Sequence, residues 1–256
     1  MSGAITLIGT GPGALELCAP AALAALGKAT IIVGYHTYLK QIDSLFPDTP
    51  RFGSGMRQEV ERAEKAIQFA REGHTVAVIS GGDAGVYGMT GLIFDLLDGD
   101  SDGIPVEVIP GITALTAAAA LLGAPLMSDF AAISLSNYLV EEATILKRLE
   151  AAARADFVIC LYNPTSSKRR AFFETACAAV EKIVGGERPV GIVRSAYRDG
   201  QSVRRCRMAE LRAAELGMDC VVIIGNSTTR FASGRMITAR GYNLHKQSTE
   251  TETLET

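Results

Sequence analysis

Short apolar runs and longer segments of helical periodicity alternate through the first half of the chain. The apolar runs are four or five residues long, which is typical of strands that are buried on both faces of a sheet. Because each run is followed by a helical segment, the pattern predicts a parallel, doubly wound sheet. The strands are expected at 4–8, 30–33, 75–79 and 105–109, and the helices at 19–29, 56–72 and 89–97.

The helix expected over 56–72 has the clearest periodicity of the chain. Its apolar residues recur at intervals of three or four positions and so form one stripe along the helix. We expect this stripe to pack on the sheet. Its members are Met56, Val60, Ala63, Ile67 and Ala70.

The second half of the chain repeats the alternation less regularly. The segment 202–207 has the character of an exposed strand, which indicates a sheet of mixed direction. The sequence thus predicts two α/β domains, 1–125 and 126–246, with the boundary among the turn residues at 124–130 and a disordered polar tail at 247–256. The other strands are expected at 131–136, 157–161, 190–193 and 220–224, and the helices at 142–154 and 168–183.

One uncharged stretch, Val108–Ser128, is 21 residues long and would suffice to cross a bilayer. Pro110, Gly111, Gly123 and Pro125 interrupt it, and its centre is alanine rather than leucine. A strand end, a turn and a buried helix of small residues explain the stretch better than a membrane span.

The stretch Ser80–Gly88 joins a predicted strand to a predicted helix and holds four glycines within eight residues. Glycine permits positive φ angles and brings bare backbone amides close to a ligand. Ligands of open α/β sheets bind beyond the carboxyl ends of the strands, where this loop would lie. Asp83 is the only charged residue of the loop. We expect it either to accept hydrogen bonds from a ligand or, with more weight, to cap the following helix.

Two other strand ends also carry glycine. Gly9–Ala14 fits the pattern G-x-G-x-x-A, a weak match to a dinucleotide-binding loop. Pro12 removes a backbone donor, and no acid follows the second strand to bind a ribose, so both features count against a nicotinamide cofactor. The third loop is Pro110–Ala114. A tight turn explains each loop taken alone, but in a parallel sheet the three loops share one edge.

In the second half, three strand ends carry asparagine or serine. We expect them to face the glycine loops across a cleft, although these residues are also common turn formers. Ser128–Asp129 lies at the proposed hinge, where the acid could act as a base or cap local structure. Arg204, Arg205 and Arg207 are expected on a solvated face. The three strand ends are 162–164, 194–196 and 225–227.

Composition narrows the classes of function. A net charge of −3, the absence of tryptophan and 6% aromatic residues argue against a nucleic-acid binder that relies on basicity or base stacking. The five cysteines are widely spaced and form no Cys-x-x-Cys or Cys/His cluster, so no metal site is expected. Free buried thiols, and an N-terminus without the features of a signal peptide, indicate a cytoplasmic protein.

Taken together, these motifs resemble the tetrapyrrole (corrin/sirohaem) methyltransferases, which use S-adenosylmethionine. They occur in the order and spacing of that family: Gly9–Gly13, Gly81–Asp83 with Val86, Pro110–Ala114 and Tyr162–Pro164. A narrower set is similar to the branch that methylates carbon 17 of precorrin-3B, with ring contraction to precorrin-4, in cobalamin biosynthesis. That set comprises 34–39, 54–59, 81–89, 128–131 and 222–227. The loop 137–141 departs from the branch, which usually has an acid and Thr-Pro-Trp there.

The resemblance implies two α/β domains with S-adenosylmethionine in the cleft between them, and a homodimer. The protein would mainly align acceptor carbon, methyl and sulfur, and exclude water. The implied contacts to S-adenosylmethionine are Pro12, Gly81, Gly82, Asp83, Val86, Thr113, Ala114, Tyr162 and Ala196. The implied contacts to the tetrapyrrole are Gly11, Pro12, Arg57, Ser128 and Arg194.

The tetrapyrrole carries several carboxylates, so basic residues are candidate clamps: Arg57, Lys168, Arg169, Arg194 and Arg230. Asp129 and Asp83 are the candidates for proton transfer during ring contraction. The alternatives are cobalt-factor III or another precorrin as acceptor, a nicotinamide-dependent oxidoreductase, and a binding module without catalysis. The chain has no ferredoxin-like cysteine segment, which favours the metal-free substrate.

Overall fold

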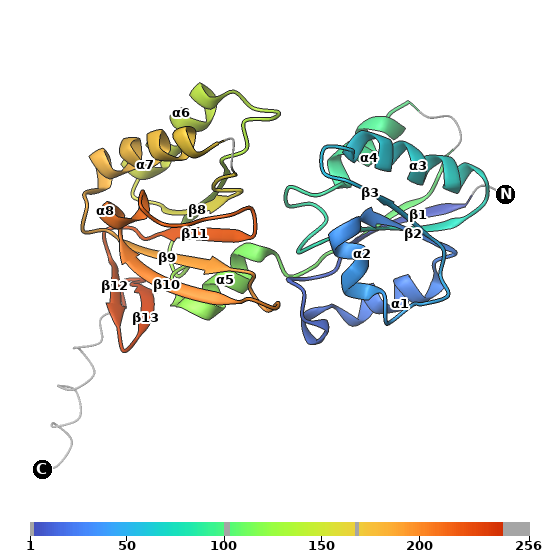
Figure 1. The fold of residues 1–256 in the computed structure, drawn as a ribbon, viewed down its shortest axis with the longest axis horizontal. Helices are drawn as coiled ribbons and strands as arrows, with labels where there is room; N and C mark the ends of the chain where they lie inside the picture. The colour runs from blue at the N-terminus through green and yellow to red at the C-terminus, as the bar shows by residue number, and fades with distance from the viewer. Residues whose placement is uncertain (1–2, 100–102, 167–168, 243–256) are drawn as a thin grey trace, which may run out of the picture. The chain divides into compact units, whose positions relative to one another are not determined.

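The computed structural model describes residues 3–99, 103–166 and 169–242 of the chain (Figure 1). These residues form two compact units. Unit 1 comprises Met1–Ala117 together with Ser195–Gln201, and unit 2 comprises Ala118–Arg194 and Ser202–Thr256. The division falls within the alanine-rich helix, whereas the sequence places a boundary at 124–130. The predicted tail, 247–256, lies outside the described residues.

The sheet of unit 1 has five parallel strands in the order β3-β2-β4-β1-β5, which confirms the predicted parallel sheet. In register, Gly9 lies beside Ser80, and Ile8 lies beside Ile109. Because all five strands run the same way, their carboxyl ends form one edge. The strands are β1 (Ala4–Gly9), β2 (Ile31–Tyr35), β3 (Arg51–Ser54), β4 (Thr75–Ser80) and β5 (Val106–Ile109); β3 was not predicted.

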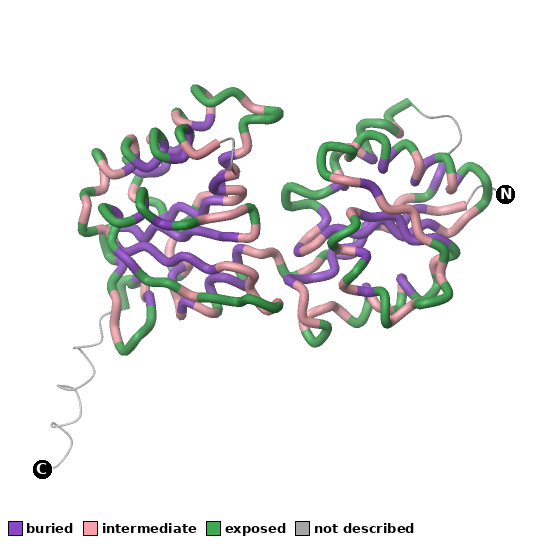
Figure 2. Tube along the Cα trace, in the orientation of Figure 1, coloured by how far each residue is buried: buried purple, intermediate pink, exposed green. Residues whose placement is uncertain are grey.

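Helices cover both faces of this sheet (Figure 1). Leu7 and Val78 pack on one face with residues of α3 and α4, and Ile8 and Ile79 pack on the other with residues of α1 and α2. Burial of both faces explains why the strands are continuous apolar runs (Figure 2). The helices are α1 (Pro20–Lys28), α2 (His36–Ile42), α3 (Glu59–Arg71) and α4 (Thr90–Leu97), with a short 3-10 helix η1 (Leu15–Leu17).

The face that α3 buries differs in part from the predicted stripe. The helix begins at Glu59, so Met56 lies in the preceding turn and is 58% exposed, and Val60 is 53% exposed. Arg62 and Ala66 are buried instead, together with Ala63, Ile67 and Ala70 as predicted. The first turn of α3 therefore packs through a guanidinium group, which apolar periodicity does not predict.

The uncharged stretch 108–128 includes the end of β5, a loop, α5 (Ala114–Leu122), β6 (Gly123–Ala124) and a turn. This division agrees with the predicted strand end, turn and small-residue helix. Among the described parts of the chain, no helix combines the length and apolarity that crossing a membrane requires.

The sheet of unit 2 is mixed, as the exposed strand at 202–207 predicted. Its order is β10-β9-β11-β8-β7. β7 is parallel to β8, β11 is antiparallel to both β8 and β9, and β10 is antiparallel to β9. The strands β7, β8 and β9 therefore end at one edge, and β11 ends at the opposite edge. The bounds are β7 (Phe130–Ser134), β8 (Val158–Tyr162), β9 (Pro189–Arg194), β10 (Ser202–Arg207) and β11 (Cys220–Ile224).

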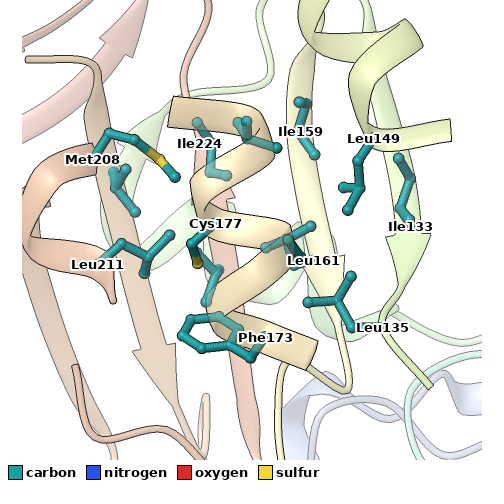
Figure 3. Close-up of a cluster of buried hydrophobic side chains, with 14 of the residues drawn as sticks. Ile133, Leu135, Leu149, Ile159, Leu161, Phe173, Cys177, Met208, Leu211 and Ile224 are labelled. Carbon is teal, nitrogen blue, oxygen red and sulfur yellow. The ribbon is translucent and has the colours of Figure 1, made fainter. Parts of the chain in front are cut away.

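One face of this sheet carries the core of unit 2. Phe173 and Cys177 of α7 (Arg170–Val184) point into a cluster with Leu149 of α6 (Glu142–Arg154) and Leu211 of α8 (Met208–Leu211) (Figure 3). On the other face, a Cβ at Gly191 would lie 2.5 Å from Cδ2 of Leu122, so α5 packs directly on β9. Two further strands, β12 (Thr229–Ala232) and β13 (Arg235–Thr238), join β6 in a small sheet.

All five cysteines are free, which confirms the predicted thiols; all are buried except Cys18, which is half-buried. Burial raises the pKa of the Cys160 and Cys177 thiols to about 12, so little reactive thiolate forms at neutral pH.

At pH 8 we expect the native protein to react with a thiol reagent at Cys18 alone, and the unfolded protein to react at all five cysteines. Peptide mapping that finds fast labelling at Cys160 or Cys177 would contradict this burial.

Candidate functional site

The three glycine loops meet at the carboxyl edge of the unit 1 sheet. Gly11 and Gly82 form an antiparallel bridge, in which Gly11 N donates to Gly82 O at 3.0 Å and Gly82 N donates to Gly11 O at 2.7 Å. Thr10 Oγ1 also donates to Ser80 O at 3.1 Å. The first and second loops are therefore fastened to each other by backbone hydrogen bonds, as their shared edge predicted.

The third loop packs on the other two so closely that only glycine fits. A Cβ at Gly9 would lie 2.6 Å from Gly111 N and 2.7 Å from Gly82 O, and a Cβ at Gly111 would overlap Gly82 O. At Gly81 a Cβ would lie 2.8 Å from Cζ of Tyr38. The sequence predicts that these glycines let backbone amides approach a ligand closely. In the structure, their lack of a side chain lets the backbones of the three loops approach one another closely.

Asp83 joins the second loop to the third. Its Oδ1 accepts a hydrogen bond from Gly85 N at 2.8 Å, and its Oδ2 accepts one from Gly111 N at 2.9 Å. The predicted helix cap is wrong, because the N-cap of α4 is Met89 and that cap has no side-chain hydrogen bond. The reason is distance along the chain: Asp83 precedes the cap residue by six positions, and both of its carboxylate oxygens already accept hydrogen bonds from loop amides.

The remaining predicted cofactor contacts of unit 1 surround this loop cluster. Thr113 and Ala114 lie against Gly82, whose added Cβ would be 3.6 Å from Thr113 Cα and 3.4 Å from Ala114 N. Ala114 is the first residue of α5. Val86 is 39% exposed, in the part of the second loop that leads to α4. These residues therefore present backbone and small apolar side chains at one edge.

Pro12 and Gly11 are buried in the first loop. The next residue, Gly13, touches the segment Ser195–Gln201, which holds the predicted contact Ala196. Arg57 is exposed in the turn between β3 and α3, with φ at 68°, and its amide donates to Glu59 Oε1 at 3.2 Å. All of these predicted residues follow strand ends of unit 1 or belong to the segment packed there.

Tyr162 and the loop after it occupy the carboxyl edge of the unit 2 sheet. Asn163 Nδ2 donates to Ser134 Oγ at 3.0 Å, which ties the ends of β8 and β7. Arg169 Nη1 donates to Leu135 O at 2.7 Å and to Asn163 O at 3.1 Å. Arg169 thus holds this loop in position. This role differs from the predicted one, in which Arg169 clamps a ligand.

Arg194 ends β9 at the same edge of unit 2. Its Nη1 lies 3.3 Å from Asp219 Oδ1, and its Nη2 donates to Glu215 O at 3.2 Å. A partner carboxylate already neutralises this guanidinium. Its predicted contact to a tetrapyrrole stays a prediction.

Ser128 and Asp129 lie at the other end of the unit 2 sheet. Asp129 precedes the first residue of β7, and its carbonyl accepts a hydrogen bond from Val158 N, at the start of β8, at 3.1 Å. Within unit 2, the structure therefore does not bring these two residues together with Tyr162. Their predicted roles in proton transfer and substrate binding stay predictions.

The segments 225–227 and 162–164 lie at opposite edges of the unit 2 sheet, although the sequence predicts that all three strand ends face one cleft. Gly225 N donates to Pro189 O at 2.9 Å, and Ser227 N donates to Asp156 Oδ1 at 2.8 Å, so this segment lies where β8 and β9 begin. The physical reason is the antiparallel direction of β11, which an apolar run does not reveal. Arg230, on β12, follows the same segment.

The cluster Arg204, Arg205 and Arg207 makes local contacts. Arg205 donates to Leu122 O at 3.5 Å, near the end of α5, and Arg207 donates to Glu187 O at 2.8 Å. Arg204 is 3.9 Å from Glu210.

Lys168, another predicted clamp, lies outside the described residues. Within the described ranges, no group of three or more His, Cys, Asp or Glu residues could hold a metal ion.

Three residues of unit 1 lie at or near the glycine loops, although the sequence did not mark them as site residues. Arg62 is buried, where Nε donates to Ser54 Oγ at 3.0 Å and Nη2 donates to Gly55 O at 2.9 Å; burial lowers its pKa. Tyr38 lies over Gly81, and Arg198 lies over Gly13. An arginine close to an apolar helical stripe was the available signal for Arg62. Tyr38 lies in the segment 34–39 that resembles the family branch, and no comparable pattern marks Arg198.

Comparison with known proteins identifies relatives over most of the chain. A model of the tetrapyrrole (corrin/porphyrin) methylases matches residues 4–212. A cobalt-factor III methyltransferase of Priestia megaterium is 43% identical over 98% of this chain; the match covers 47% of that protein, so the chain spans about half its length. A probable cobalt-factor III C(17)-methyltransferase of Salmonella typhimurium is 42% identical over 94% of this chain and 100% of that protein.

A precorrin-3B C(17)-methyltransferase of Sinorhizobium is 37% identical over 90% of this chain and 91% of that protein. The crystal structure of the methyltransferase CobJ matches with a TM-score of 0.87 and 35% identity, over 93% of this chain and 100% of that one. The chain therefore belongs to the tetrapyrrole (corrin/porphyrin) methylase family.

Proposed function

We propose that this protein transfers a methyl group from S-adenosylmethionine to carbon 17 of precorrin-3B, with ring contraction to precorrin-4, in cobalamin biosynthesis. The observation that carries the proposal is the convergence of the three glycine loops at one sheet edge, fastened by the Gly11–Gly82 bridge and by Asp83. The family membership and the names of the relatives support the reaction type. The loop cluster contains no arrangement typical of a covalent nucleophile, and methyl transfer from a sulfonium needs none.

The residues at this edge fit an adenosyl ligand. Gly82, Thr113 and Ala114 present backbone within van der Waals distance of one another, and Val86 adds an exposed apolar side chain. Such a surface suits a nucleoside, which needs close backbone approach and few charged groups. When bound, S-adenosylmethionine supplies an already activated methyl group. The work left to the chain is to align the acceptor carbon with that methyl and to exclude water.

The contacts that we propose for S-adenosylmethionine are Pro12, Gly81, Gly82, Asp83, Val86, Thr113, Ala114, Tyr162 and Ala196. Those proposed for the tetrapyrrole are Gly11, Pro12, Arg57, Ser128 and Arg194. Asp83 and Asp129 stay the proposed groups for proton transfer. The two carboxylate oxygens of Asp83 accept hydrogen bonds from Gly85 N and Gly111 N, which fix the orientation of this carboxylate.

The acceptor has two candidate forms, with and without cobalt. The relatives of Priestia and Salmonella are named for cobalt-factor III, and the relative of Sinorhizobium is named for precorrin-3B. Cobalt-factor III is therefore the second candidate acceptor, and the two relatives named for it are 43% and 42% identical to this chain, against 37% for the relative named for precorrin-3B. We further propose, from the family resemblance, that the protein is cytoplasmic and forms a homodimer. Light scattering on the purified protein would test the homodimer through its molar mass.

The proposal is tested by incubating the protein with isotopically labelled S-adenosylmethionine and, in separate reactions, precorrin-3B and cobalt-factor III. We expect label in one tetrapyrrole product, with the mass increase of a single methyl group and with S-adenosylhomocysteine formed in equal amount. Uroporphyrinogen III serves as the control acceptor and should receive no label. Absence of transfer to both acceptors, or tight binding of a nicotinamide dinucleotide with hydride transfer, would contradict the proposal.

A further inference from the structure

Arg198 occupies a position at the glycine loops that none of the roles considered above uses. It belongs to the segment Ser195–Gln201, which is part of the same compact unit as the loops. Its aliphatic stem lies on Gly13, where an added Cβ would be 2.6 Å from Arg198 Cδ and would overlap Cγ. Any side chain at residue 13 would displace the arginine, so the last glycine of the first loop leaves room for it.

The backbone that presents Arg198 is a tight turn with unusual φ angles. Ser195 has φ at 47° and Tyr197 has φ at 56°, a conformation that costs a residue other than glycine free energy. Hydrogen bonds hold the turn closed: Arg198 N donates to Ser195 O at 3.0 Å, and Gln201 N donates to Arg198 O at 3.1 Å. Tyr197 N also donates to Gln201 Oε1 at 2.7 Å. The arginine is thus held by a fixed loop rather than by a flexible one.

Among the residues that the structure describes, the guanidinium group of Arg198 has no hydrogen-bond or ion-pair partner that would explain this arrangement. Its Nε is buried and makes no hydrogen bond, and within the described residues no carboxylate forms an ion pair with Arg198. A buried donor normally has a partner, and a charged donor without one costs more than a neutral one. The adjacent acid, Asp199, is exposed. The geometry therefore leaves one strong donor group to be satisfied from outside the protein.

The surroundings of Arg198 connect it to the second loop as well as the first. Its positive charge lowers the pKa of the Tyr38 phenol, against the larger rise that burial causes. Tyr38 in turn lies over Gly81, and Gly81 adjoins the Gly11–Gly82 bridge. An anion paired with Arg198 would therefore lie at the edge where the loops meet.

We propose that Arg198 binds a carboxylate of a ligand at the glycine-loop edge of unit 1. The planar guanidinium matches a carboxylate through two parallel N–H···O hydrogen bonds, which would satisfy the donors that the protein leaves open. This inference rests on the proposed function for its choice of ligands, because both ligands of that reaction carry carboxylates. S-adenosylmethionine has one, on its amino-acid part, and the tetrapyrrole has several on its rim.

The test compares Arg198→Gln with the wild-type protein in two binding titrations. Calorimetry with S-adenosylhomocysteine, and with 5′-methylthioadenosine, which lacks the amino-acid part, reports the first carboxylate. Fluorescence titration with uroporphyrin III, together with the KM and kcat for the tetrapyrrole acceptor, reports the second. We expect Arg198→Gln to weaken binding of one carboxylate ligand by about 10- to 100-fold, with kcat changed far less. Methylthioadenosine binding should be unchanged.

Three matched variants separate charge from structure. Arg198→Lys keeps the charge and should recover part of the affinity. Arg204→Gln removes an exposed arginine whose ion-pair distance is 3.9 Å, and should bind like the wild type. Gly13→Ala should displace Arg198 and reproduce the loss seen with Arg198→Gln. The double variant should be no worse than either single one, because both changes remove the same interaction.

The inference is overturned if Arg198→Gln binds both S-adenosylhomocysteine and uroporphyrin III within twofold of the wild-type affinity and has a KM for the tetrapyrrole acceptor within twofold of the wild-type value. If the wild type methylates its acceptor and Arg198→Gln does so with unchanged KM, this inference fails and the proposed function stands. If the wild type transfers no methyl group but binds S-adenosylhomocysteine in an Arg198-dependent way, the proposed function fails and the inference stands. A wild-type protein that binds neither probe overturns both.

Discussion

Gly111→Ala is expected to weaken S-adenosylhomocysteine binding by at least about 100-fold, because it separates the three loops that form the proposed site. An added Cβ would lie 2.7 Å from both Gly9 C and Gly9 O, and closer still to Gly82 O. These atoms are backbone atoms of two strand ends and cannot rotate away. The loops must therefore move apart, which should cost about 3 kcal/mol of folding stability and lower the melting temperature by about 6 to 12 °C.

Gly91→Ala is the matched control for this prediction. Gly91 lies in α4, and an added Cβ there would meet no atom within 4 Å. Alanine is the better helix former, so this variant should be neutral or more stable by up to about 1 kcal/mol. Calorimetric titration and thermal unfolding of the two variants side by side measure the difference. A Gly111→Ala protein that binds and melts like Gly91→Ala would contradict the close packing of the loops.

The sequence allowed the fold of unit 1 and the location of its loops to be predicted for a clear physical reason. A strand covered by helices on both faces is an uninterrupted apolar run, as in β1 and β4, and such runs imply parallel neighbours. Parallel direction then places the Gly9, Gly82 and Gly111 loops at one edge without any further information. The structure confirms that edge by the Gly11–Gly82 bridge.

Strand direction in unit 2 could not be predicted in the same way. The apolar run at β11 is compatible with either direction, and only the pairing of Val222 with Leu161 and Ile192 settles it as antiparallel. One reversed strand moved Asn226 to the opposite edge from Tyr162. The sequence also could not reveal Arg198, because its contact with Gly13 joins positions that are far apart along the chain.

The meaning of the glycines changed more than their location. Their frequency in the loops predicts a ligand that needs bare backbone, but the structure accounts for Gly9, Gly82 and Gly111 by contacts among the loops themselves. Both explanations operate at once if the packed loops form the floor of a ligand site. Asp83 raises a similar question, because two roles are proposed for its carboxylate, fastening the loops and transferring a proton, and these lead to different experimental results.

Asp83→Asn is expected to weaken S-adenosylhomocysteine binding by about 10- to 100-fold and to lower the free energy of unfolding by about 1.5 to 3 kcal/mol. The carboxylate accepts hydrogen bonds from Gly85 N and Gly111 N with separate oxygens. Asparagine has one oxygen, so its amide nitrogen would face one of those N–H groups. A donor facing a donor leaves both unsatisfied, which releases the third loop from the second.

Asp95→Asn on α4 is the control, because Asp95 is exposed and the change has the same chemistry. It should leave binding and stability unchanged.

Comparison of ligand affinity, stability and kcat in Asp83→Asn then distinguishes the two roles proposed for Asp83. If Asp83 fastens the loops, the Asp83→Asn protein should lose ligand affinity and stability together. Its kcat, measured at saturating ligand, should then stay close to that of the wild type. If affinity and stability are instead retained while kcat falls by about 100-fold or more, the carboxylate transfers a proton. In that case its hydrogen bonds to Gly85 and Gly111 hold the base in place and contribute little to the packing of the loops.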